Sequence, residues 1–166
     1  MPLSEAALEL LRSSSGLTID DEGRFLHRGE PVLHTRTLEV LWSSLGPTSG
    51  GRWLVRIGRE SAYVGVAETP WIVRGVDAGD GSSAPTLFLA DGSREPLDPA
   101  TLRLGDDGVL RCTVSRGRPA RFGRAAQIAL GAALHEDPPG SERFVLDVAG
   151  RRWTVARGAQ RVEGAP

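Results

Sequence analysis

The chain contains no lysine and no asparagine, so all 20 of its basic residues are arginines. They are balanced by 21 acidic residues, which leaves a formal net charge of −1 over 166 residues. General attraction to nucleic acid or to an anionic membrane needs a clear excess of positive charge. We therefore expect no membrane partner and no bulk binding of nucleic acid. A local basic site is still compatible with this net charge.

Several signatures of catalysis and metal binding are also missing. The single cysteine, Cys112, excludes an internal disulfide framework, and its place within a predicted strand indicates a buried, unreactive thiol. The three histidines show no metal-ligand spacing. No GxSxG elbow is present, and the glycine-rich residues 46–52 lack the GK[ST] end of a phosphate-binding loop. We therefore expect a protein that is not an enzyme and uses no cofactor and no metal.

Long apolar runs are missing as well. No segment approaches the roughly 20 apolar residues that a membrane-spanning helix needs. Residues 1–16 lack the basic and apolar regions of a signal peptide and have the pattern of a short amphipathic helix. These observations predict a cytoplasmic protein.

The apolar residues that are present predict two further helices among many short strands. Leu38, Leu41, Trp42 and Leu45 follow the i, i+3, i+4, i+7 spacing of one helical face. A second, alanine-rich helix is predicted over residues 123–134. The strands are predicted over residues 17–19, 25–28, 53–57, 61–66, 71–76, 86–90, 102–104, 109–114, 144–148 and 153–155.

The order of these elements repeats along the chain. Each half has a turn, a strand, a Gly-x-Pro segment, a helix, a strand and a hairpin. We interpret the chain as an α+β fold with an internal duplication of a ββαββ unit, in which a helix packs on each small antiparallel sheet. Residues 1–77 form the N-terminal helix and the first unit, and residues 78–166 form the second. The polar residues 77–85 form either a long hairpin loop or a linker between domains. The corresponding pairs are Gly23 and Gly108, Pro31 and Pro119, Val40 and Ile128, Trp53 and Phe144, and Tyr63 and Trp153.

Arginines gather before the second helix and indicate an anion-binding site. Arg116 lies in the preceding turn, and Arg121 and Arg124 are spaced i, i+3 at the predicted start of the helix. Two guanidinium groups together with the N–H groups of a helix start would suit a phosphate or a carboxylate. The alternative is that these arginines are solvated, or are paired with carboxylates such as Asp106, Asp107 and Glu142.

Two further residues are candidates for the same site. Glu60 lies between two predicted strands and either pairs with an arginine of the other half or is exposed. Trp71 follows Pro70 at the start of a strand, where an indole either stacks on a base or packs in a core or an interface.

Three stretches of the sequence resemble the domain of unknown function 1285 (DUF1285) family of bacterial proteins. These are GLTIDDEGRF, RWLVRIGRESAYVGVAETPW and SRGRPARFGR, within residues 16–158. The family pattern "TPvEkw.I.VeDaPF" corresponds to residues 57–71 of this chain, and "GLeARl.R" corresponds to residues 117–124. In the first pattern, Ile57-Gly58 replaces the Thr-Pro, Ser61 replaces the Lys and Trp71 replaces the Phe.

The resemblance implies an α+β fold with an internal duplication and a C-terminal half loosely similar to pleckstrin-homology-like folds. It also implies a ligand site between the halves, for a nucleotide-like or nucleic-acid-derived molecule, in signalling. We therefore expect a non-enzymatic sensor or binding protein. Arg121 and Arg124, near Arg116, would hold the phosphates of the ligand, Glu60 would orient it and Trp71 would stack on it.

Two other classes of function stay open. A protein–protein interaction module without a small-molecule ligand is the first alternative, because the apolar strands leave sheet edges to which a partner could add. An enzyme is the second, and it would need His27 or His34 in a pocket beside Glu60.

Overall fold

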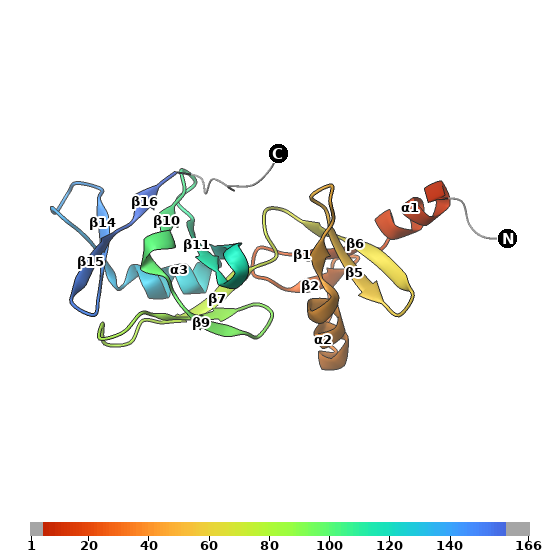
Figure 1. The fold of residues 1–166 in the computed structure, drawn as a ribbon, viewed down its shortest axis with the longest axis horizontal. Helices are drawn as coiled ribbons and strands as arrows, with labels where there is room; N and C mark the ends of the chain where they lie inside the picture. Colours follow the sequence, from red (N-terminus) through yellow and green to blue (C-terminus); the bar gives the residue numbers. More distant parts are fainter. Residues whose placement is uncertain (1–4, 159–166) are drawn as a thin grey trace. The chain divides into compact units, whose positions relative to one another are not determined.

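The computed structural model describes residues 5–158 and divides the chain into two compact units, Met1–Glu68 and Thr69–Pro166 (Figure 1). The boundary therefore lies at Glu68–Thr69 and not between residues 77 and 78. Strand β7 (Ile72–Asp77) causes the difference, because it forms hydrogen bonds only within the sheet of the second unit.

The first unit is a helix-covered sheet of six short strands. Its spatial order is β3-β2-β1-β6-β5-β4. The sheet is mixed and not purely antiparallel as predicted, because β1 pairs in parallel with β6. The elements in chain order are α1 (Glu5–Ser13), β1 (Leu17–Ile19), β2 (Phe25–His27), β3 (Glu30–Pro31), α2 (Thr35–Ser44), β4 (Gly46–Pro47), β5 (Trp53–Ile57) and β6 (Glu60–Val66).

Helix α2 packs against β5 and closes the core of the first unit (Figure 1). The predicted helical face is confirmed, since Leu41 is fully buried and Trp42 meets Phe25 edge to face at 4.8 Å. The helix begins at Thr35, and the Nδ1 atom of His34 accepts a hydrogen bond from the backbone N–H of Thr37. This histidine therefore caps a helix. The buried core residues are Ile19, Phe25, Leu41, Val55 and Val64.

Polar side chains attach helix α1 to this sheet, chiefly through the carboxylate of Glu9. Glu9 accepts hydrogen bonds from Nη1 of Arg52 at 2.8 Å and from the hydroxyl of Tyr63 at 3.1 Å. The guanidinium of Arg52 also lies 3.4 Å from the centre of the Tyr63 ring. The three side chains together fasten α1 to β5 and β6.

The second unit contains a seven-stranded sheet, a three-stranded sheet and one α-helix. The spatial orders are β16-β10-β11-β12-β7-β8-β9 and β13-β14-β15. The elements after β7 are β8 (Thr86–Leu89), β9 (Arg94–Pro96), the 3-10 helix η1 (Pro99–Thr101), β10 (Arg103–Leu104), β11 (Leu110–Val114), the turn η2 (Ser115–Gly117), β12 (Arg118–Phe122), α3 (Arg124–Gly131), β13 (Leu134–Glu136), β14 (Phe144–Val148), β15 (Arg151–Thr154) and β16 (Ala156–Arg157).

Residues 77–85 form the loop of a hairpin and not a linker. Strands β7 and β8 are antiparallel, and Asp77 pairs with Thr86 at the end of the ladder. Both strands that flank the loop therefore belong to one sheet. Of the two alternatives that the sequence left open, the hairpin loop is confirmed.

The arginine-rich segment before α3 is a strand, where the sequence predicted a turn. Strand β12 pairs antiparallel with β11, so that Thr113 faces Pro119. The reversal occurs at Arg116 and Gly117, which have φ angles of 65° and 68°. Because the backbone nitrogen of proline donates no hydrogen bond, Pro119 is a residue that disfavours the prediction of a strand at this position. The helix is also shorter than predicted, and Leu134 begins β13.

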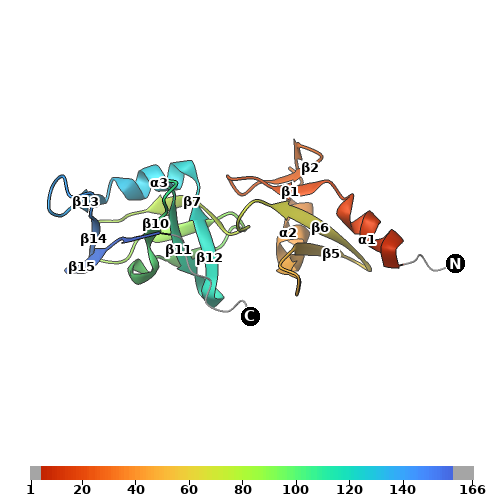
Figure 2. The ribbon, with the colours of Figure 1, turned by 90° about the horizontal axis from the view of Figure 1, so that it is seen from above.

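Helix α3 packs against β7, as both ribbon views show (Figures 1 and 2). Ala126 and Leu130 face the core, and Gln127 and Ile128 lie further out. The N–H of Gly123, the residue before the helix, donates to the carbonyl of Val73 in β7. The sheet thus fixes the start of the helix.

The two units share an order of elements. In each, an antiparallel hairpin leads to a third strand and then to a helix, and the first strand of the hairpin pairs in parallel with the last strand of the unit. The α+β class is confirmed. The internal duplication and the pleckstrin-homology-like half stay predictions.

Thr69 joins the start of β7 to β12. It is the one buried polar side chain among residues 5–158, at 4% exposure. Its hydroxyl donates to the carbonyl of Pro119 at 2.7 Å and accepts from the N–H of Trp71 at 3.2 Å. The Thr-Pro-Trp run singled out in the sequence therefore has a structural role.

We predict that Thr69→Val lowers the free energy of unfolding of the second unit by about 1–3 kcal/mol, because it leaves two buried backbone groups without their partner. Chemical denaturation measures the change. Thr86→Val in β8 is the control, since the described structure contains no hydrogen bond to its side chain. Equal effects of the two substitutions would show that the Thr69 hydroxyl is not needed.

Candidate functional site

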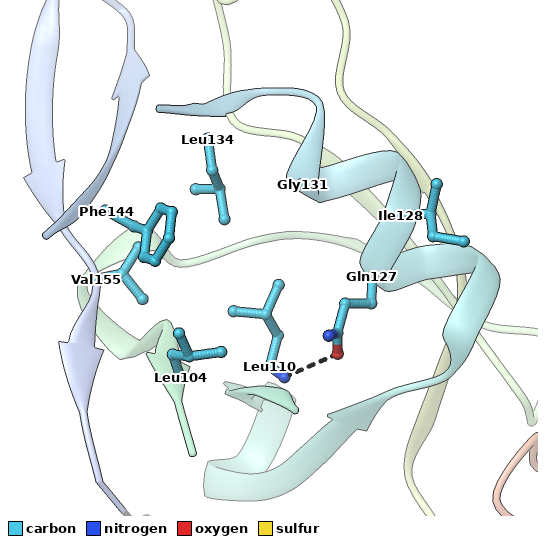
Figure 3. Close-up of a pocket in the computed structure, with 8 residues that line it drawn as sticks. All are labelled: Leu104, Leu110, Gln127, Ile128, Gly131, Leu134, Phe144 and Val155. Carbon is cyan, nitrogen blue, oxygen red and sulfur yellow. Dashed lines mark hydrogen bonds between the residues drawn. The ribbon is translucent and has the colours of Figure 1, made fainter. Parts of the chain in front are cut away.

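The second unit carries an apolar pocket of about 330 Å³ between α3 and the strands that face it (Figure 3). Aliphatic and aromatic side chains converge on it from the strands, and Gln127 approaches it from the helix (Figure 3). This volume lies at the lower end of the range for small-molecule sites. The lining residues are Leu104, Leu110, Gln127, Ile128, Gly131, Leu134, Phe144 and Val155.

Strand pairing places the apolar wall of the pocket. Leu104 of β10 and Leu110 of β11 are direct cross-strand partners, so both point to the same side of the sheet. Leu134 of β13 pairs with Leu146 of β14, which brings the three-stranded sheet to the end of α3. The wall is thus made by elements that are far apart in the sequence.

Gln127 contributes the polar group of the pocket. Its Oε1 atom accepts from the N–H of Leu110 at 3.0 Å, and its Nε2 atom donates to the carbonyl of Gly108 at 2.7 Å (Figure 3). These two bonds fasten α3 to the turn between β10 and β11. The amide therefore holds the helix in place at the edge of the pocket.

Gly131 keeps one side of the pocket open. A Cβ atom built on this residue would have no atom within 4 Å. Its helical backbone accepts any side chain, so a larger residue would project into open space. None of the eight lining residues is titratable. The lining of the pocket is therefore mainly apolar, with Gln127 as its polar side chain.

Arg157 lies beside the pocket. It pairs with Leu104 across β16 and β10, and its Cζ atom is 6.0 Å from the centre of the Phe144 ring. Its Nη2 atom donates to the carbonyl of Glu142 at 2.7 Å. A positive charge is thus held next to two residues of the apolar lining.

Arg121 lies in β12 and belongs to a row of three arginines. Arg103 pairs with Arg111, and Arg111 pairs with Arg121, across three neighbouring strands. Paired residues share one face of a sheet, with Cβ atoms roughly 4.5–5.5 Å apart. Asp107 makes two hydrogen bonds to Arg111, at 2.9 and 2.8 Å, and the guanidinium holds the pKa of this carboxyl well below its usual value. A Cβ on Gly105 would displace the guanidinium of Arg111 and the carboxylate of Asp107 from their present positions.

The other two predicted arginines lie at separate positions. Arg124 is the first residue of α3, and Arg116 is exposed at the turn between β11 and β12. Since Arg121 is in a strand, Arg121 and Arg124 do not form the i, i+3 pair on a helix that the sequence predicted. Arg124 does precede Gln127 and Ile128 by three and four residues, which places it on their side of α3.

Trp71 is buried, at 8% exposure. The guanidinium of Arg118 lies 4.0 Å from the centre of its ring, and the Nε atom of Arg118 donates to the carbonyl of Ser115. One face of the indole is therefore covered by a side chain of its own unit. This geometry favours packing, the alternative to base stacking.

Glu60 and the histidines lie outside this region. Glu60 is exposed at the start of β6 in the first unit, opposite Ile57. His27 and His34 are also exposed and belong to the first unit. His135, in β13, approaches Asp147 at 3.5 Å. None of these residues lines the pocket, and no group of three or more His, Cys, Asp or Glu side chains within residues 5–158 could hold a metal ion.

Two solved structures resemble the fold of this chain. A DUF1285 family protein from Silicibacter pomeroyi DSS-3 matches with a TM-score of 0.61 at 17% sequence identity, over 85% of this chain and 79% of that one. The chain has the fold of the DUF1285 family. A DUF1285 family protein from Shewanella baltica OS155 matches with a TM-score of 0.53 at 18% identity, over 72% of this chain and 92% of that one. No family model and no curated protein matches the sequence.

The DUF1285 fold here carries its pocket on residues that the sequence did not single out. Gln127 and Gly131 interrupt an alanine-rich helix, and small residues on a helix leave room beside it. The sequence did not indicate a binding role for Arg157, because this residue lies next to Leu104 only through the pairing of β16 with β10.

No helix within the described range is long and apolar enough to cross a membrane.

Cys112, in β11 of the DUF1285 fold, is predicted to resist alkylation in the folded protein. It is fully buried, and burial, assisted by the charges of Glu95 and Asp98, raises the pKa of its thiol to about 12. Labelling with iodoacetamide at pH 8 should therefore be much slower in the folded chain than in denaturant, with mass spectrometry as the readout. Equal rates in both states would contradict this expectation.

Proposed function

We propose that this chain is a non-enzymatic binding protein that takes up a small molecule in the pocket of its second unit. The observation that carries the proposal is the pocket itself, which is mainly apolar and has room for a small ligand. The proposed location is the cytoplasm.

The sheet edges give less support to a protein-interaction module that adds a strand. Among the edge strands, β3, β4 and β9 end in Pro31, Pro47 and Pro96, whereas β13, β15 and β16 contain no proline. Each proline removes a donor that an added strand would use. Strand addition is thus disfavoured at these three edges, and small-molecule binding is the better-supported proposal because the pocket is already formed.

The test is a substitution that fills the pocket without harming the fold. We expect Gly131→Leu to weaken the binding of 1-octanol at least about tenfold, because the new side chain occupies the open side of the pocket. Stability should be kept, since glycine is a poor helix former. Titration calorimetry measures the affinity and thermal denaturation measures the stability.

Ala125→Leu is the matched control. Ala125 is an exposed residue of the same helix that does not line the pocket, so this variant should bind 1-octanol like the wild type. The proposal fails if the wild type does not bind 1-octanol, or if Gly131→Leu binds it as well as Ala125→Leu does.

A nucleotide-like anion is the second candidate ligand, favoured by the row of Arg103, Arg111 and Arg121. Aligned like charges on neighbouring strands destabilise a sheet, and Asp107 is bound to the middle arginine of the row. A phosphate over the row would accept charge-assisted hydrogen bonds from guanidinium groups. This ligand would use a different face from the pocket, because Leu104 and Leu110 alternate with Arg103 and Arg111 along their strands.

For this candidate we expect ATP to raise the melting temperature of the wild type and to have a smaller effect on Arg103→Gln. Arg74→Gln is the control, since Arg74 is an exposed arginine of β7 outside the row. An equal response of the two variants to ATP would exclude the row as its binding site.

A further inference from the structure

We propose that the pocket binds a small amphipathic carboxylate, with the apolar chain in the pocket and the carboxylate on Arg157. This inference rests on the proposed function, because it names the class of ligand for the same pocket. The lining supplies the first half of the argument. Six of its eight residues have hydrocarbon side chains and Gly131 has none, so the buried part of the ligand must be apolar.

Arg157 supplies the second half of the argument. It is the partner of Leu104 in the β10–β16 ladder, so its side chain leaves the sheet on the side of a pocket residue. Its guanidinium lies 6.0 Å from the ring centre of Phe144, which is another lining residue. A ligand that fills the pocket and extends past Phe144 would meet this positive charge.

The side chain of Arg157 is held in place and keeps donors for a ligand. One N–H of Nη2 is used by the carbonyl of Glu142, which anchors the guanidinium. A guanidinium has five N–H donors in a planar fork, and this geometry matches the two oxygens of a carboxylate. The anchoring reduces the entropy that ligand binding would otherwise cost.

The acidic groups around Arg157 compete only weakly for it. The carboxylate of Glu142 is 3.9 Å away and its side chain is 83% exposed, which makes a weak, solvent-screened pair. Glu136, in β13, accepts a hydrogen bond from the N–H of Gly140. Asp107 is bound to Arg111. The side chain of Arg157 is itself 54% exposed, so a ligand carboxylate can reach it and replace Glu142 there.

The experiment compares three ligands that share one apolar chain: octanoate, 1-octanol and octylamine. By titration calorimetry at low salt, the wild type should bind octanoate at least about tenfold more tightly than 1-octanol, as a charge-assisted hydrogen bond implies. It should bind octylamine, which is cationic at pH 7, no better than 1-octanol. Arg157→Gln should bring octanoate down to the affinity of 1-octanol and leave 1-octanol unchanged.

Arg151→Gln is the matched control. Arg151 also lies over an aromatic ring, with its Cζ atom 4.2 Å from the centre of Trp153. Its substitution by glutamine changes the net charge of the protein by the same amount as Arg157→Gln. This variant should keep the preference for octanoate. If both variants lose the preference equally, or if the wild type shows none while Gly131→Leu still abolishes 1-octanol binding, the carboxylate inference is overturned and the binding pocket stands. If none of the three ligands binds, the proposed function is overturned as well.

Discussion

The pairing of β12 with β7 is the interaction on which the second unit depends. This ladder joins β10–β11–β12 to β7–β8–β9, and it has only two pairs in register, Arg121 with Ile72 and Phe122 with Val73. Backbone bonds from Arg121 to Trp71 and from Gly123 to Val73 extend it. The buried hydroxyl of Thr69 secures one end. Because parallel pairing is slightly weaker per residue than antiparallel pairing, so short a ladder needs these additional bonds.

The pocket follows from this ladder. Once the N–H of Gly123 is bound to β7, the direction of α3 is fixed, and its turns place Gln127 and Gly131 opposite Leu104 and Leu110. The chain then returns through β14 and β15 to β16, which carries Arg157 to the edge of the same sheet. Apolar lining and positive charge are thus brought together by three separate segments. The charge balance of the whole chain, which is close to zero, does not reveal this local arrangement.

The sequence predicted the parts of the fold that local patterns determine. The apolar face of α2, the buried Cys112 and most strands follow from periodicities within a few residues. Strand β12 was not predicted, because Pro119 is a residue typical of turns. The boundary between the two units was predicted after β7, because the glycines and serines of residues 77–85 are typical of a linker. The parallel pairings and the pocket depend on contacts between distant segments, for which one sequence holds no signal. The resemblance to DUF1285 sequences correctly predicted the fold class.

The long hairpin loop between β7 and β8 has a consequence for how this fold can vary. Its two ends are fixed by the pairing of Asp77 with Thr86, and its central residues are polar or small and mostly exposed. The carbonyl of Gly81 accepts a backbone hydrogen bond from the N–H of Ala149, which ties the centre of the loop to another segment. A doubling of the length of such a loop adds only about 0.6 kcal/mol of closure entropy. Insertions can therefore accumulate here during evolution, or be engineered as labels, without altering the strands on either side.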